Sequence, residues 1–169
     1  DTTPPVITAK YNNETVSNNA TLVVEKYTGI EADVSTNEGQ IIPNKVFSNT
    51  TTQQIIYSAT DPNNNTTTFT INYNVVDTVP PTGTLDTPII NDKTMTVSIT
   101  NLTESCQAQF IGRNNGILFD FNNFETTSHT FTFTETDYGT FDHKIQLFDG
   151  TNVSEQYPFS ATFVDTRYP

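Results

Sequence analysis

The stretch from Asp61-Pro62-Asn63 to Val76-Asp77-Thr78-Val79-Pro80-Pro81 returns later as Asp149-Gly150-Thr151 to Val164-Asp165-Thr166-Arg167-Tyr168-Pro169. In both copies the second aspartate lies sixteen positions after the first. Apolar residues alternate with polar ones in between: Phe69, Ile71, Tyr73 and Val75, then Tyr157, Phe159, Ala161 and Phe163. A repeat of this kind decides the architecture before any single motif does.

The boundary also opens the chain, which begins Asp1-Thr2-Thr3-Pro4-Pro5. Three boundaries bracket two repeat units, so we expect two domains, 1–77 and 78–169, with residues 165–169 beginning a linker to a further module. Proline cannot donate to a sheet ladder, so the last strand of each unit should end at Val76 or Val164. Paired prolines should keep the connection extended and semi-rigid.

Both units alternate apolar and polar residues with period two, and no segment carries a helical stripe. Turn-forming Asn, Asp and Gly residues separate the alternating runs. The strands expected in the first unit are Val6–Tyr11, Thr21–Lys26, Ile30–Val34, Ile41–Phe47, Gln54–Thr60 and Thr67–Val76. Those expected in the second are Thr82–Leu85, Thr94–Thr100, Gln107–Ile111, Ile117–Phe121, Thr127–Phe133, Thr140–Phe148 and Tyr157–Val164. This pattern predicts an all-β chain of two tandem immunoglobulin-like β-sandwich domains.

The composition is acidic, with 19 Asp and Glu against 7 Lys and Arg, a net charge of −12. Both units carry a share of this net negative charge, so both would repel phosphate backbones and anionic membrane surfaces. We therefore expect no nucleic-acid partner. No apolar run approaches the roughly 20 residues that span a bilayer, so we expect no membrane insertion in this segment.

The repeat boundaries carry a resemblance to a known kind of module. Tyr57-Ser58-Ala59-Thr60-Asp61 followed by the Asp77-Thr78-Val79-Pro80-Pro81 linker resembles the bacterial-type, HYR-like immunoglobulin-like repeats of cell-surface adhesion proteins, which are joined by Asp-Thr-Thr-Pro-Pro linkers. The second unit departs from the pattern, with Ile145 and Leu147 in place of the tyrosine and alanine. The resemblance implies an extracellular or cell-surface location within a larger secreted or membrane-anchored protein.

A second likeness lies in Asp137-Tyr138-Gly139-Thr140-Phe141-Asp142-His143, which has the spacing of the immunoglobulin strand F signature. Phe141 stands at the position of the corner tyrosine, whose hydroxyl it lacks. His143 stands at the inward-facing cysteine position, so we expect it at the edge of the core. The disulfide of true immunoglobulin domains is therefore missing.

We expect no enzyme. The chain has two histidines, His129 and His143, and one cysteine, Cys106, and none lies in a recognisable catalytic motif. Cys106 has no partner for an intramolecular disulfide and is expected to fill a small apolar site. His129 is expected on the surface at the start of a strand.

The only expected cofactor is calcium, which prefers several oxygen ligands. Candidate ligands in the first unit are Asp61, Asn63 and Asp77, and in the second Asp149 and Asp165, with Asn65 and Asn152 nearby. The resemblance adds that linker aspartates bind calcium in some adhesin arrays. The alternative is structural, since Asp61 can cap its own turn through an Asx hydrogen bond.

Seven Asn-x-Ser/Thr sequons are candidate glycosylation sites, most of them in expected turns where a glycan would stand clear of the core. They are Asn13, Asn19, Asn49, Asn64, Asn65, Asn101 and Asn152. Because Asn, Ser and Thr are abundant, about five sequons arise by chance, so their number carries little weight.

A binding face is the last candidate. Phe119, Phe121 and Phe124 lie close to Arg113 in sequence, and aromatics with arginine are enriched in interface centres. The alternative is that these rings fill the core of a sandwich that has no tryptophan. Exposed strand edges offer another way to add a partner chain.

The function expected from these features is adhesion or cell–cell recognition, in which tandem repeats project a protein-binding surface toward another protein ectodomain, by homophilic or heterophilic contact. A purely structural spacer or stalk in a surface layer, adhesin rod or virion is one alternative. An accessory module of a secreted enzyme is another.

Overall fold

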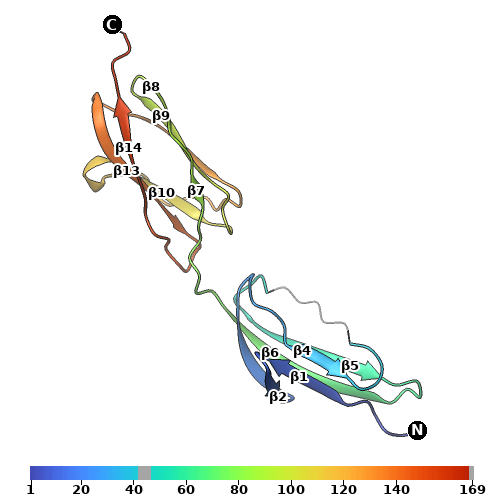
Figure 1. Cartoon of the computed structure of the whole chain (residues 1–169). Helices are drawn as coiled ribbons and strands as arrows, with labels where there is room; N and C mark the ends of the chain where they lie inside the picture. Colours follow the sequence, from blue (N-terminus) through green and yellow to red (C-terminus); the bar gives the residue numbers. More distant parts are fainter. Residues whose placement is uncertain (42–46, 168–169) are drawn as a thin grey trace. The chain divides into compact units, whose positions relative to one another are not determined.

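In the computed structural model, residues 1–41 and 47–167 are described, and every regular element apart from one short turn is a β-strand. The chain divides into two compact units, Asp1–Asp77 and Thr78–Pro169, each with its own hydrophobic core (Figure 1). The fold class expected from the sequence is confirmed: both units are β-sandwiches of the immunoglobulin-like kind.

Unit 1 packs two three-stranded sheets face to face. One sheet has the order β2-β1-β4, built from β1 (Ile7–Tyr11), β2 (Glu14–Val16) and β4 (Asp33–Thr36). The other has the order β3-β6-β5, built from β3 (Ala20–Glu25), β5 (Thr52–Thr60) and β6 (Thr66–Val76). β3 runs parallel to β6, and the other pairs are antiparallel.

Unit 2 packs two four-stranded sheets. The first has the order β11-β10-β13-β14, with β10 (Gln107–Ile111), β11 (Ile117–Phe119), β13 (Gly139–Phe148) and β14 (Tyr157–Phe163). The second has the order β12-β9-β7, with β7 (Thr84–Leu85), β9 (Thr94–Thr100) and β12 (His129–Thr134), and β8 (Ile89–Asn91) also pairs with β9. A single 3-10 turn, Arg113–Asn115, joins β10 to β11.

The last hairpin of each unit is the structural form of the sequence repeat. In β5–β6 Tyr57 opposes Phe69, and in β13–β14 Ile145 opposes Tyr157. A shift of 88 residues converts the first register into the second, so the repeat is preserved in strand pairing as well as in sequence. Because a one-residue slip would turn every core side chain outward, the shared register fixes which residues fill each core.

Alternation places the core residues as the sequence predicts. In β9 Met95, Val97 and Ile99 are buried, and the hydroxyl residues between them form hydrogen bonds with β12 on the outer face. Left-handed backbone occurs chiefly at asparagines in turns, where the short polar side chain tolerates positive φ. The abundance of asparagine therefore serves the tight connections between strands.

Several expected strands differ from the structure. The strand expected at Ile30–Val34 begins only at Asp33, and Ile30 is exposed. The expectation was wrong there because it continued the alternation of apolar and polar residues back into the preceding turn. The strand expected at Ile41–Phe47 falls mostly on residues 42–46, outside the described residues. Two short hairpin strands, β2 and β8, were not expected, since three residues carry too little alternation to stand out.

A polar network inside unit 1 was also not anticipated. Tyr73 is fully buried, and its hydroxyl accepts the backbone N–H of Ala32 at 3.0 Å and contacts the Tyr57 hydroxyl at 2.8 Å. Tyr57 in turn donates to the Glu31 carboxylate. Since the carboxylate can only accept, Tyr73 must donate to Tyr57, and each hydroxyl is satisfied. Burial, followed by the bond to Glu31, raises the pKa of Tyr57 far above its usual value of 10.

Candidate functional site

The two repeat aspartates cap the hairpin loops that follow them. Asp61 accepts the backbone N–H groups of Asn63 at 2.8 Å and Asn65 at 2.9 Å, and its second oxygen accepts the Asn65 side chain at 2.8 Å. Asp149 does the same with Thr151 at 2.7 Å and Asn152 at 2.6 Å. These are the Asx turns that the sequence offered as the alternative to calcium. The bond from Asn65 holds the pKa of Asp61 below its usual range, although burial opposes the shift.

The structure gathers acidic side chains around one of the predicted calcium ligands, Asp61. In unit 1, carboxylate oxygens of Asp1, Glu38 and Asp61 all lie within 4.8 Å of one another. Asp61 is buried, whereas Asp1 and Glu38 are exposed. Neither Asp1 nor Glu38 was among the predicted ligands, because only the fold brings them to the Asp61 loop. Asn63 joins this loop through its backbone N–H.

The linker aspartates lie beside basic groups. The Asp77 carboxylate is 3.4 Å from the Lys26 ammonium within unit 1. Asp165 forms two bonds with the Arg167 guanidinium, both at 2.9 Å. That bidentate contact lowers the pKa of Asp165 to about 2. Both predicted calcium ligands therefore already have a cationic neighbour within their own unit.

The sequon asparagines fall into two groups. Asn13, Asn19, Asn49, Asn64 and Asn101 are exposed in turns or bends. Asn65 and Asn152 instead use their side-chain amides to hold the capping aspartates, at 2.8 Å and 3.2 Å. A glycan on either amide would replace one of its two N–H hydrogens, and Asn65 uses its amide for a second bond, to the Asp1 carbonyl at 3.2 Å.

Cys106 and His129 lie close together but not in a catalytic arrangement. His129 begins β12 and is half-buried, and its Nε2 lies 2.7 Å from the carbonyl oxygen of Cys106, not from its thiol. The thiol is fully buried, and burial, helped by nearby Glu104 and Asp149, raises the pKa of Cys106 to about 11. A protonated, buried thiol is a poor nucleophile, so this geometry does not activate Cys106.

His143 lies deeper than the expected core edge. It is 2% exposed, and its ring stacks on Phe110 and Phe159 at centroid distances of 5.6 and 5.4 Å. Nδ1 donates to the Phe141 carbonyl at 3.0 Å, and Nε2 is buried with no hydrogen-bond partner among the described residues. Burial therefore lowers the pKa of His143 below 6.5. The residue fills the core as an aromatic ring.

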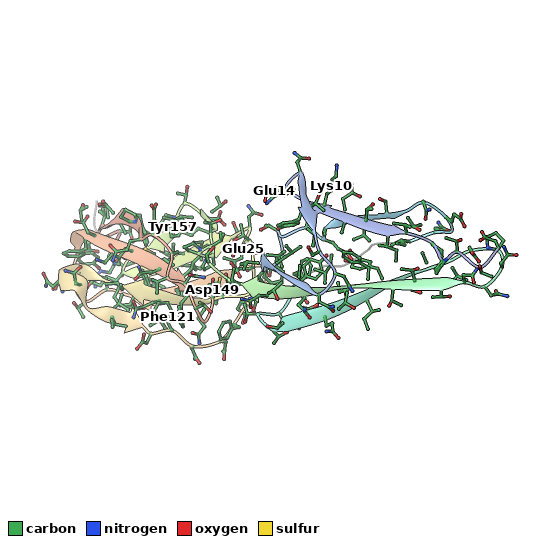
Figure 2. All side chains as sticks on the ribbon, turned by 90° about the horizontal axis from the view of Figure 1, so that it is seen from below. Lys10, Glu14, Glu25, Phe121, Asp149 and Tyr157 are labelled. Carbon is green, nitrogen blue, oxygen red and sulfur yellow. The ribbon has the colours of Figure 1, made fainter. Side chains whose placement is uncertain are left out.

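The phenylalanines of the predicted binding face are largely exposed. Phe119 is 40% exposed and Phe124 is 51% exposed, while Phe121 is half-buried against Phe148. The alternative that all three fill the core is therefore wrong for Phe119 and Phe124. Figure 2 labels Phe121 on the loop after β11. The sequence left a binding face and the core as alternatives for these rings, and β11 ends at Phe119, where the loop that carries Phe121 and Phe124 begins.

Arg113 does not belong to this aromatic group. It lies in the 3-10 turn beyond Ile111, where its guanidinium binds Asp137 at 2.7 Å and stands over the Phe141 ring at 4.4 Å. Phe121, by contrast, packs on Phe148, which pairs with Gln107 at the other end of β10. The structure therefore separates Arg113 from Phe121.

A groove of about 620 Å³ runs between β12 and the segment from Leu118 to Glu125. Its floor includes Phe119 and Phe131, whose rings are 5.4 Å apart, and its rim carries the carboxylates of Asp120 and Glu125. A pair of backbone bonds between Cys106 and Glu125 anchors the loop at one end. Sequence reasoning identified the aromatics but not the groove, because β12 and β11 belong to different sheets.

Comparisons with known proteins give little further guidance. No family model matches the chain, and no curated protein matches it in sequence. Among solved structures it is similar to fibronectin(III)-like modules of CbhA from Clostridium thermocellum, at 9% identity over 94% of both chains with a TM-score of 0.40. Within the described residues, no helix is long and apolar enough to cross a membrane.

Proposed function

We propose that the chain is a recognition segment of an extracellular, cell-surface protein, in which tandem immunoglobulin-like repeats present a protein-binding surface on unit 2. The observation that carries the proposal is the exposure of Phe119, which ends β11 and lines the groove, and of Phe124 in the loop that follows. Large aromatic rings at the surface are costly to hydrate and are enriched in the centres of protein interfaces. The partner is another protein ectodomain, either a different protein or a second copy.

The rival function is a spacer repeat with no ligand of its own. The two functions differ in what they predict in solution. A recognition module self-associates or binds a partner ectodomain, whereas a spacer stays monomeric and binds nothing at high concentration. Sedimentation velocity over a wide concentration range tests the homophilic case, and binding of the labelled chain to displayed ectodomains tests the heterophilic case.

A pair of variants makes this test specific. Phe119→Ser with Phe124→Ser should weaken the association at least about tenfold, since interface aromatics commonly contribute more than 1 kcal/mol each. The matched control is Ile89→Ser with Val164→Ser, which removes two apolar side chains of similar exposure elsewhere in unit 2. If the Phe119 and Phe124 variant associates as strongly as the natural chain, the binding surface does not lie at these two residues. If neither the natural chain nor either variant associates with anything, the spacer is the better account.

We further propose that unit 1 binds calcium at the Asp1, Glu38 and Asp61 carboxylates, whose clustering supports this site. Binding would bring the chain start and two loops together and raise the melting temperature of unit 1. Thermal melts of the natural chain and a Glu38→Gln variant, with calcium and with chelator, test this. Identical midpoints in all four samples would remove calcium from the account.

We also propose that, in a glycosylating host, glycans occupy the exposed sequons and spare the two amides that hold the capping aspartates. Mass spectrometry of peptides from the secreted chain tests this. Occupancy of Asn13 or Asn19 with Asn65 and Asn152 unmodified is the expected outcome, and full occupancy of Asn65 and Asn152 in the folded chain would contradict it.

A further inference from the structure

The groove of unit 2 lies between two sheet edges. Within the fully described part of unit 2, β11 pairs only with β10, and β12 pairs only with β9. Each strand therefore presents one unpaired backbone edge, which is a template for another strand. β11 has three residues, whereas β12 has six and so offers about 20 Å of edge at the usual rise of 3.3–3.4 Å per residue. β12 is the edge long enough to accept an added strand.

The groove lining combines aromatic and acidic side chains with neutral polar ones and His129. Phe119 is exposed over the floor, and its ring lies 5.4 Å from that of Phe131. Asp120 and Glu125 are both exposed on the rim. One oxygen of Asp120 accepts the Gln109 side chain and the Phe121 backbone N–H, both at 2.8 Å, and the second oxygen has no hydrogen-bond donor among the described residues. Such a surface favours a cation, which the carboxylates attract and the ring faces also stabilise.

The basic residues of unit 2 are engaged away from the groove. Lys93 and Arg167 lie over the Tyr138 ring, at 4.5 and 6.0 Å. Arg113 binds Asp137, and Lys144 donates to Asn115 at 2.9 Å. No lysine or arginine lines the groove in this described part of the chain. The groove therefore carries an uncompensated negative charge.

We propose that this groove takes an extended, basic segment of a partner protein, which adds to β12 as a further strand and directs lysine or arginine side chains onto Asp120 and Glu125. The proposal rests on the proposed recognition function and names the chemistry of the partner. Backbone pairing along β12 supplies the binding that does not depend on sequence. Because side chains of a strand alternate between faces, the groove selects segments with a basic residue at every second position.

The test uses the whole chain and synthetic eight-residue peptides, with affinity measured by fluorescence anisotropy at low and at moderate salt. Alternating Lys-Thr is the matched peptide, and alternating Glu-Thr has the same spacing with opposite charge. A third peptide carries the lysines and threonines in two blocks, and a fourth is the matched peptide methylated at every backbone nitrogen. The expected result is binding of the matched peptide, weaker binding of the block peptide, and none of the other two.

Variants of the protein identify the site. Asp120→Asn with Glu125→Gln keeps the size of both side chains and should weaken the matched peptide about fivefold at low salt, since each exposed pair contributes modestly. Asp86→Asn with Glu155→Gln changes net charge equally outside the groove and should leave affinity unchanged. Added salt should reduce the difference in affinity for the matched peptide between the groove variant and the natural chain, because salt screens exposed charges.

Each other outcome overturns the inference. Equal binding of the acidic peptide, or an unchanged affinity in the groove variant, excludes a basic partner at this site. Full binding of the methylated peptide excludes strand addition. If the peptides fail while the Phe119 and Phe124 variant still loses association, only the basic groove partner is wrong. If that variant and the natural chain both associate with nothing, the recognition function itself falls.

Discussion

The hydroxyl of Tyr73 offers the sharpest test of how unit 1 is held together. Replacing Tyr73 with phenylalanine keeps the ring, which packs on Phe47 at a centroid distance of 5.0 Å, and removes a single oxygen. That oxygen is the acceptor for the backbone N–H of Ala32, which is 2% exposed. The substitution also removes the donor to the Tyr57 hydroxyl.

The free-energy cost of Tyr73→Phe follows from the hydrogen-bonding groups that lose their partner. A buried N–H without an acceptor costs about 1–3 kcal/mol, and the lost hydroxyl pair adds about 1 kcal/mol. We expect Tyr73→Phe to lower the free energy of unfolding of unit 1 by about 2–4 kcal/mol, which in a domain of this size lowers its melting temperature by roughly 8–30 °C. Tyr57→Phe leaves no backbone group unsatisfied, so its cost should be smaller, about 1–2 kcal/mol.

Urea unfolding followed by tyrosine fluorescence and circular dichroism measures these differences, since the chain has no tryptophan. Tyr11→Phe is the control: Tyr11 is half-buried on β1 and its hydroxyl has no hydrogen-bond partner among the described residues, so the free energy of unfolding of this variant should stay within about 0.5 kcal/mol of that of the natural chain. The double Tyr57 and Tyr73 variant should cost less than the sum of the single variants, because they share one bond. If Tyr73→Phe changes the free energy of unfolding no more than the Tyr11→Phe control does, the network does not stabilise unit 1 and the reasoning is refuted.

Further predictions concern buried groups. The pKa of His143 in the folded chain lies below its unfolded value of 6.5, so the free energy of unfolding of unit 2 should fall as the pH drops below 6.5, by up to about 1.4 kcal/mol per pH unit. His143→Phe should remove this pH dependence between pH 6.5 and 5. Urea titrations that show the same pH dependence in the variant would contradict the burial of a neutral His143. Cys106 should react with a thiol reagent only as fast as unit 2 unfolds, and fast labelling in native buffer would show that the thiol is open. Asp61→Asn should remove part of the acid sensitivity of unit 1, because the lowered pKa of Asp61 contributes stability above about pH 4 that is lost below it. An acid-unfolding transition identical to that of the natural chain would show that ionised Asp61 does not stabilise its loop.

The sequence was most informative where periodicity and register agree. The hairpin that ends each unit was predicted to within two residues, because alternating large residues such as Tyr57 and Phe69 leave only one register that buries both. The likeness to the immunoglobulin strand F signature placed His143 facing inward at the edge of the core, and the residue lies deeper than that, at 2% exposure. The capping of loops by Asp61 was foreseen as an alternative because an Asx turn is encoded within a few residues.

The features that the sequence did not predict, or left between two alternatives, depend on how distant segments of the chain come together. The sequence left a binding face and the core as alternatives for Phe119 and Phe124, and it is the end of β11 at Phe119 that leaves both rings at the surface. The groove needs β12 beside β11, a juxtaposition of two sheets that no local pattern encodes. The acid cluster of unit 1 likewise joins Asp1 to Asp61, sixty residues apart.

The central claim is that two β-sandwiches are encoded one after the other, each with a complete core of its own. Segments 1–77 and 78–169 should be produced separately and compared with the whole chain by amide NMR and thermal unfolding. The account predicts that each segment unfolds cooperatively and that its dispersed spectrum overlays most of the corresponding signals of the whole chain. A segment that is unfolded alone, yet structured within the whole chain, would contradict it.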